Sequence, residues 1–147
     1  MTPADDLAPE LVADRLHSAA IHLLRRLRVE DAASGLTAPR LSALSVIVFG
    51  GPLTLGALAA AEQVRPPTMT RLVAALERDG LVTRETDLTD RRQILLSATS
   101  AGRQLLEEGR VRRTASLTKR LAALPAADLR VLARAAALLE RLSRRPE

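Results

Sequence analysis

The fold of this chain is decided by residues 55–96, which read LGALAAAEQVRPPTMTRLVAALERDGLVTRETDLTDRRQILL. Four apolar side chains in this stretch recur at the spacing of one buried helical face: Met69, Leu72, Val73 and Leu76. Pro66 and Pro67 suit the first turn of that helix, and Gly80 suits the left-handed position that ends it. A short helix over residues 55–63 precedes it across only two residues. This spacing predicts a helix-turn-helix.

Two strand-like segments follow the second helix and separate this unit from a plain helical hairpin. Residues 81–86 and 93–98 are rich in strand-forming side chains, with apolar residues alternating in the second segment. The charged loop between them, residues 87–92, is longer than a minimal hairpin needs and ends in Arg91 and Arg92. Because longer loops are often functional, we expect this loop to contact a partner.

The ordered set of these motifs resembles the MarR family (multiple antibiotic resistance regulators) of winged helix-turn-helix proteins. The resembling segments are 53–59 (LTLGALA), 68–73 (TMTRLV), 76–82 (LERDGLV), 90–92 (DRR) and 96–102 (LSATSAG). The resemblance implies a DNA-binding transcriptional regulator, most often a repressor, that binds a pseudo-palindromic operator as a homodimer. It also implies a small-molecule pocket that often accepts anionic aromatic compounds.

We therefore predict an α+β, mostly helical chain that forms one MarR-like domain over residues 1–147. The winged lobe is expected over residues 36–98, and dimerisation helices over residues 5–33 and 100–143. Leucine stripes mark long helices at 7–32, 100–121 and 126–143, and the winged unit is too small to cover all three. Symmetric pairing with a second copy would cover them. An intramolecular bundle is the alternative.

Composition excludes several classes of function. The net charge is +5, but the excess lies in residues 101–147, which hold eleven basic and five acidic residues. Net charge is therefore weak support for DNA binding, and the argument depends on individual arginines. The chain has no cysteine, so thiol chemistry is excluded, and no apolar run reaches the roughly 20 residues of a membrane span. We expect a cytoplasmic protein without a cofactor.

The second helix of the helix-turn-helix carries the predicted DNA contacts. Arg65 stands where a capping side chain is usual, which leaves the N–H groups of Thr68 and Met69 without a side-chain acceptor. A phosphate could take that place, since a helix N-terminus favours anions. Thr68, Thr70 and Arg71 could reach the major groove, with Arg71 as a bidentate donor to guanine. The alternative is a helix face that is only solvated.

The loop arginines suit the minor groove, whose negative potential attracts guanidinium groups. The resemblance assigns the inserted arginine to Arg92 and makes Asp90 its orienting partner, with Arg91 beside it. Arg84, on the first strand, is a phosphate contact or a plain surface residue. The alternative for Asp90 and the arginines is a surface ion pair of little energetic value.

Other chemistry is poorly supported. His17 and His22 are five residues apart, which does not suit chelation from one helical face, and no cysteine or carboxylate cluster completes a metal site. No catalytic arrangement is recognisable, so an enzyme is not expected. His22, Arg25 and Arg26 are candidate partners for a ligand carboxylate, or simply exposed groups beside the dimer interface. The rival function is a basic helical module that binds a membrane surface or a protein partner.

Overall fold

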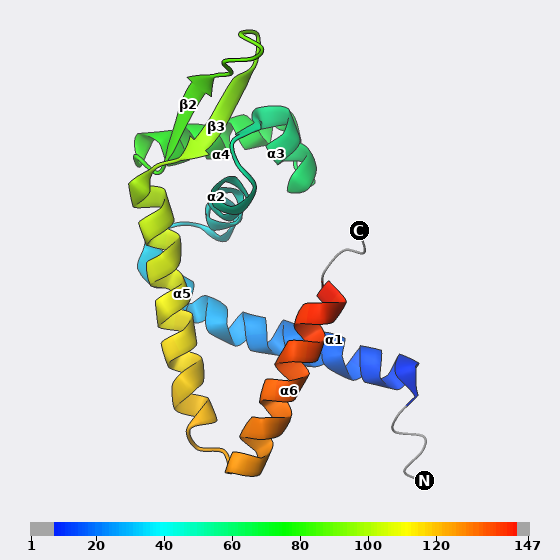
Figure 1. Cartoon of the computed structure of the whole chain (residues 1–147). Coiled ribbons are helices and arrows are strands. Elements are labelled where there is room, and N and C mark those ends of the chain that lie inside the picture. The colour runs from blue at the N-terminus through cyan, green and yellow to red at the C-terminus, as the bar shows by residue number, and fades with distance from the viewer. Residues whose placement is uncertain (1–7, 144–147) are drawn as a thin grey trace. The chain divides into compact units, whose positions relative to one another are not determined.

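The computed structural model describes residues 8–143, which are mostly helical with one small sheet (Figure 1). The helices are α1 (Pro9–Leu27), η2 (a 3₁₀ helix, Arg28–Ser34), α2 (Ala38–Gly50), α3 (Leu55–Ala61), α4 (Pro66–Arg78), α5 (Ser100–Leu121) and α6 (Ala126–Ser143). The strands are β1 (Leu53–Thr54), β2 (Val82–Thr86) and β3 (Ile94–Ala98). The predicted fold class is confirmed.

The sheet is antiparallel with the order β1-β3-β2. The hairpin β2–β3 pairs Val82 with Ala98 and Thr86 with Ile94, so both predicted strands are present. β1 pairs Leu53 with Leu96 and was not predicted. A strand of two residues is too short to show alternation, and its partner lies far away in the sequence.

The core lies between α2, α3, α4 and the sheet, and α4 packs against both α2 and α3. Its fully enclosed large side chains are Leu44, Ile47, Leu58, Met69, Val73, Leu76 and Leu96. α3 begins where the Thr54 hydroxyl accepts a hydrogen bond from Ala57 N–H at 3.1 Å. It ends at Ala61, two residues before the predicted end, and the turn that follows places Gln63 at φ 53°. This tight turn leads directly into α4.

The first helix differs from the prediction of one helix through residue 32. α1 ends at Leu27, and the chain continues as the 3₁₀ helix η2 through Ser34. The Ser34 hydroxyl donates to the Asp31 carbonyl at 2.6 Å and accepts from Leu36 N–H at 3.2 Å. Gly35 then takes the left-handed conformation, with φ 72°. These side-chain bonds to the backbone compete with α-helical bonding and turn the chain toward α2.

The start of α5 is joined closely to the junction between α4 and β2. The Thr99 hydroxyl donates to the Gly80 carbonyl at 2.7 Å and accepts from Gly102 N–H at 3.1 Å. Thr99 N–H donates to the Leu81 carbonyl at 3.0 Å. Gly102 is buried, and a Cβ atom there would lie 2.3 Å from the Leu81 carbonyl oxygen. Thr99 is thus the cap of α5, and glycine is required three residues later by close backbone approach.

The chain divides into two compact units, Met1–Arg113 and Thr114–Glu147. The second unit contains the end of α5 and the whole of α6. The predicted bounds of α6 are confirmed. α6 begins after Pro125, whose carbonyl accepts from Asp128 N–H at 3.0 Å and from Leu129 N–H at 3.1 Å. Within residues 8–143, no single helix is long and apolar enough to cross a membrane, although one pair bent by 90°, Pro9–Ser34 with Ala38–Gly50, meets that standard when taken together.

The junction at Gly102 predicts the cost of adding one methyl group. Gly102→Ala should lower the free energy of unfolding by about 1–3 kcal/mol, because the backbone at Leu81 must move to admit the new Cβ atom. The measurement is urea denaturation of the purified variant.

The matched control is Gly56→Ala, also in the first turn of a helix, where a Cβ atom would meet only the Thr54 hydroxyl at 4.0 Å. That variant should be unchanged or slightly more stable, since alanine is the better helix former. Equal stability of the two variants would contradict the proposed close approach at Gly102.

Candidate nucleic-acid interface

α4 has one face in the core and one face in solvent. Met69, Val73 and Leu76 are completely buried, and Leu72 packs against the same core. The opposite face carries the exposed side chains Thr68, Thr70, Arg71, Ala74 and Arg78. The predicted division of this helix is therefore observed, and the small side chain of Ala74 allows close approach by a partner. The outer face therefore offers hydrogen-bond donors to a partner whose surface carries acceptors.

The backbone hydrogen bonds at the N-terminus of α4 differ from the prediction made from the sequence. Thr68 N–H and Met69 N–H both donate to the Arg65 carbonyl, at 3.0 and 3.1 Å. The two preceding residues, Pro66 and Pro67, have no N–H group. The expectation that a phosphate would satisfy the N–H groups of Thr68 and Met69 is therefore wrong. Arg65 does lack a side-chain capping bond, as predicted, and its exposed side chain remains a predicted contact.

The hydroxyl group of Thr70 is already engaged in a hydrogen bond within α4. Its Oγ1 donates to the Pro66 carbonyl at 2.9 Å, one turn earlier in α4. The carbonyl takes the hydroxyl hydrogen, so the oxygen lone pairs and the methyl group remain for a partner. Arg71 is exposed on the same outer face of α4 and has the longer side chain. Arg71 is thus the longer-reaching hydrogen-bond donor of this pair.

The loop between β2 and β3 projects from the sheet (Figure 1) and is organised by two aspartates. Asp87 Oδ1 accepts from the backbone N–H and from the hydroxyl of Thr89, both at 2.8 Å. These two bonds hold the pKa of Asp87 below its usual value, and the bond from the Thr89 backbone has the larger effect. Asp90 Oδ1 accepts from Arg92 N–H at 3.0 Å, and its Oδ2 accepts from the Gln93 side-chain amide at 3.1 Å. We call residues 87–93 the wing loop.

Both loop arginines, Arg91 and Arg92, are exposed. Asp90 acts on Arg92 through the backbone, because its carboxylate accepts the Arg92 N–H. Arg84, the remaining predicted contact, donates from Nε to Glu77 Oε1 at 2.8 Å. This bond links β2 to the last turn of α4. Sequence reasoning missed the pair because the two residues lie on different elements, seven positions apart.

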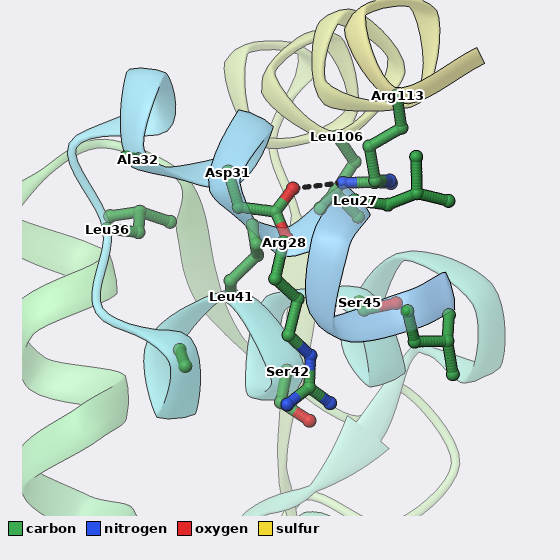
Figure 2. A pocket seen from close by; sticks show the side chains of 12 residues that line it. Leu27, Arg28, Asp31, Ala32, Leu36, Leu41, Ser42, Ser45, Leu106 and Arg113 are labelled. Carbon is green, nitrogen blue, oxygen red and sulfur yellow. Dashed lines mark hydrogen bonds and ion pairs between the residues drawn. The ribbon is translucent and has the colours of Figure 1, made fainter. Parts of the chain in front are cut away.

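A separate cavity of about 630 Å³ lies between α1, η2, α2 and α5. Its lining residues are Leu24, Leu27, Arg28, Asp31, Ala32, Leu36, Ala38, Leu41, Ser42, Ser45, Leu106 and Arg113. Figure 2 shows Arg28 extending toward Ser42, and Arg113 reaching from α5 to Asp31. The walls are thus mostly aliphatic, and their polar groups are two guanidinium groups, one carboxylate and two serine hydroxyls.

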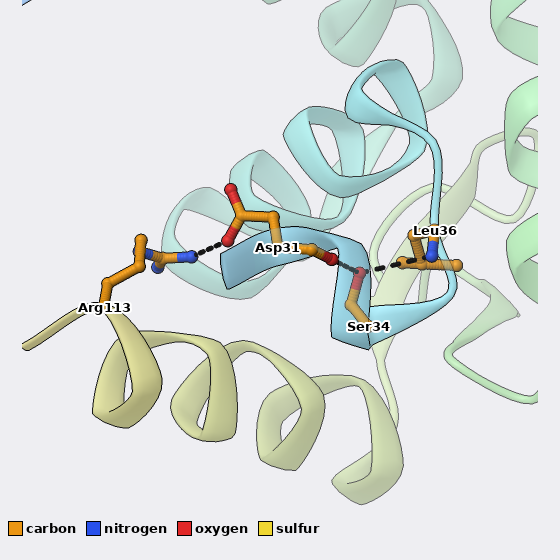
Figure 3. Close-up of polar contacts among 4 residues, drawn as sticks. All are labelled: Asp31, Ser34, Leu36 and Arg113. Carbon is orange, nitrogen blue, oxygen red and sulfur yellow. Dashed lines mark hydrogen bonds and ion pairs between the residues drawn. The ribbon is translucent and has the colours of Figure 1, made fainter. Parts of the chain in front are cut away.

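Asp31 and Arg113 form an ion pair that connects η2 with α5 (Figure 3). Figure 3 also shows Ser34 bonded to the Asp31 backbone, so the turn that ends η2 holds Asp31 in place. Gly109 lies one turn before Arg113, and a Cβ atom at Gly109 would come within 3.3 Å of Arg113 Nη1. The absence of a side chain at Gly109 gives the guanidinium its room.

The predicted ligand residues His22, Arg25 and Arg26 do not line this cavity, and their role stays a prediction. Arg28, Asp31 and Arg113, which do line it, were not predicted from the sequence. Only the break of α1 at Leu27 brings Arg28 and Asp31 into the wall, and the sequence pattern did not show that break. Among residues 8–143, no group of three or more histidine, cysteine or acidic side chains could hold a metal ion.

Comparison with known proteins identifies the arrangement. An HTH-type transcriptional regulator of Mycobacterium bovis is 38% identical over 128 residues, which cover 87% of this chain and 90% of the relative. A regulator of Mycobacterium leprae matches to the same extent. The sequence profile of the MarR family matches residues 36–94. The chain belongs to the MarR family.

Solved structures agree with this assignment. A transcriptional regulator from Pseudomonas aeruginosa is 31% identical with a TM-score of 0.76, covering 99% of this chain and 100% of that one. A transcriptional regulator from Thermotoga maritima is 28% identical with a TM-score of 0.79, covering 92% and 99%. This MarR protein is therefore a DNA-binding transcriptional regulator and not an enzyme. Regulators of the MarR family bind DNA as dimers.

The hydrogen bonds of Asp90 predict a role that is separate from its charge. Asp90→Ala removes the acceptor for Arg92 N–H and should weaken DNA binding several-fold, because the wing loop loses its fixed shape. Asp90→Asn removes the same negative charge but keeps an acceptor oxygen, so it should bind more tightly than Asp90→Ala. Fluorescence anisotropy with labelled duplex measures both. Equal affinity of the two variants would show that the turn is unimportant for binding.

Proposed function

We propose that this protein represses transcription by binding a pseudo-palindromic operator as a homodimer, from which a small anionic ligand releases it. The observation that carries the proposal is the division of α4. Its apolar face is buried in the core, whereas Thr68, Thr70 and Arg71 are exposed on the other face. A rigidly mounted helix with an exposed, donor-bearing face is suited to the major groove.

Side chains must supply the phosphate contacts of this interface. Pro66 and Pro67 lack N–H groups, and the next two N–H groups already donate to the Arg65 carbonyl. The N-terminus of α4 thus offers few free donors, in contrast to a typical anion-binding helix end. We assign phosphate contact to the side chains of Arg65 and Thr68. Arg84 is available for the same purpose only if it leaves Glu77.

The wing loop supplies the second contact of each protomer. Arg91 and Arg92 are exposed, and the aspartates of the loop are already engaged in hydrogen bonds. A guanidinium group at this position suits a narrow minor groove, where the negative potential is strongest. We assign Arg92 to the groove and Arg91 to the adjacent backbone.

The terminal helices support the proposed homodimer. Neither α1 nor α6 has a buried residue, although both are amphipathic. α1 exposes six large apolar side chains: Leu11, Val12, Leu16, Ile21, Leu23 and Leu24. α6 exposes another six: Leu129, Val131, Leu132, Leu138, Leu139 and Leu142. Such faces are costly in water, and a symmetric second copy would cover both.

The cavity beside η2 supports the proposed ligand. Aliphatic walls suit an apolar body, and Arg28 and Arg113 suit a negative group. Because Arg113 is paired with Asp31, a ligand carboxylate would have to compete with Asp31 for it. Separation of that pair would free α5 from η2, and α5 begins at the Thr99 junction beside α4. We place the protein in the cytoplasm, where its operator would be.

The direct test is selection of bound duplexes from a random pool. We expect an inverted repeat whose half-sites lie about one helical turn apart, as for a symmetric dimer. Selection of no sequence, together with binding to anionic vesicles, would favour the alternative of a basic helical module. Binding to duplex should also fall steeply with salt.

The two arginine sites are predicted to differ in what they recognise. Arg71→Ala should cost ~1–3 kcal/mol on the best operator and relax the preference at one base pair, since Arg71 contacts a base edge. Arg92→Ala should weaken binding to all sequences and reduce the slope of log affinity against log salt by about one unit, because one positive charge no longer meets the DNA. Neither variant should unfold, because both side chains are exposed.

Both variants are measured on a matched and a mismatched duplex at several salt concentrations. If Arg71→Ala weakens both duplexes equally while Arg92→Ala removes the preference, the assigned roles are reversed.

The ligand proposal predicts that one arginine transmits the response. Benzoate at millimolar concentration should weaken operator binding by the wild-type protein, and Arg113→Gln should abolish that response. The matched control is Arg110→Gln, since Arg110 lies on the same helix but bonds to Glu107 and does not line the cavity. An identical benzoate response in all three proteins would exclude this cavity as the benzoate site.

A further inference from the structure

Leu88, in the wing loop, is the most exposed large apolar side chain of residues 8–143, with 97% of its surface accessible. Such exposure means that the side chain packs against nothing in its own chain. The next most exposed are Phe49 (80%) near the end of α2, Leu142 (78%) on α6 and Val29 (73%) in η2, whereas the large apolar side chains of α1 are 36–56% exposed. Leu88 lies on a loop between charged and polar neighbours, so no extended apolar surface surrounds it. Leu88 can therefore contact a partner only as a single projecting side chain.

The structure holds Leu88 in this exposed position. Asp87 closes one turn by accepting two hydrogen bonds from Thr89, at 2.8 Å each. Asp90 closes the next turn by accepting from Arg92 N–H at 3.0 Å. Leu88 and Arg91 occupy the middle of these successive turns. A loop fixed in this way loses little conformational entropy when it binds.

The charges of the wing indicate why an apolar contact matters. Residues 84–93 contain three arginines and three acidic residues, so the wing carries no net charge. One of these arginines, Arg84, is already bonded to Glu77. Long-range attraction to phosphates therefore contributes little to holding the wing on DNA. Short-range contact must supply part of its affinity.

We propose that Leu88 enters the DNA minor groove beside the wing arginine and packs against the deoxyribose walls. Apolar side chains enter the minor groove in other DNA-binding proteins, where they insert between base steps and act together with arginine side chains that respond to the width of the groove. The proposed contact supplies affinity that does not depend on salt, whereas Arg92 supplies affinity that does. The inference rests on the DNA-binding function and on the assignment of the wing to the minor groove.

The experiment compares Leu88→Ala, Leu88→Met and Arg92→Ala in operator binding at several salt concentrations. Leu88→Ala should weaken binding about tenfold, which corresponds to about 1.4 kcal/mol for partial burial of a leucine side chain. The slope of log affinity against log salt should stay at the wild-type value, because the substitution removes no charged group. Leu88→Met restores the apolar volume and should recover most of the affinity. Thermal unfolding should be unchanged in both leucine variants.

The outcomes separate this inference from the proposed function. If the wild type binds and Arg92→Ala weakens binding, but Leu88→Ala binds as the wild type does, Leu88 makes no contact and the inference fails alone. The inference is also overturned if Leu88→Ala weakens binding and reduces the slope of log affinity against log salt. It is overturned as well if Leu88→Met binds no better than Leu88→Ala. If Arg92→Ala has no effect, the assignment of the wing itself is wrong.

Discussion

The structure depends on one close backbone contact, at which the first turn of α5 meets the junction of α4 and β2. Thr99 bonds to the carbonyl groups of Gly80 and Leu81, and the missing side chain of Gly102 permits the approach. This contact fixes the end of α4 to the start of α5, the helix that lines the cavity. The same α5 supplies Leu106 and Arg113 to the cavity wall. A change at the Asp31–Arg113 pair is therefore connected to α4 through one continuous helix, which is the physical basis of the proposed ligand response.

Acidic residues organise the face that we propose binds DNA. Residues 61–100 hold six basic and six acidic side chains, so the region is not a basic patch. Three of the acids have identified tasks: Glu77 bonds to Arg84, Asp87 closes the first turn of the wing loop, and Asp90 closes the second. Their hydrogen bonds fix where Leu88, Arg91 and Arg92 are presented. Affinity for DNA would then come from placement of a few side chains more than from net charge.

The elements that the sequence predicted correctly are those with strong local signals. The bounds of α5 and α6 agree with the structure, and Pro66 marks the start of α4 as expected. The features that were missed depend on contacts between distant residues: β1 exists because Leu53 meets Leu96, and Arg113 reaches Asp31 from another element. The expectation of free N–H groups at the start of α4 was wrong for a local reason, because the Arg65 carbonyl accepts a hydrogen bond from each of the two groups. Sequence patterns show which face of a helix is apolar, but they do not show which backbone groups are already bonded.

The proposed homodimer is tested most directly by sedimentation equilibrium of the protein alone and with a duplex that carries the selected inverted repeat. We predict a species of two 15.8 kDa chains without DNA, and a complex of two chains on one duplex. A duplex with a single half-site should bind much more weakly, because only one α4 and one wing would be engaged. A protein that remains monomeric at micromolar concentration, and that binds the full repeat as a single chain with undiminished affinity, would contradict the proposed homodimer.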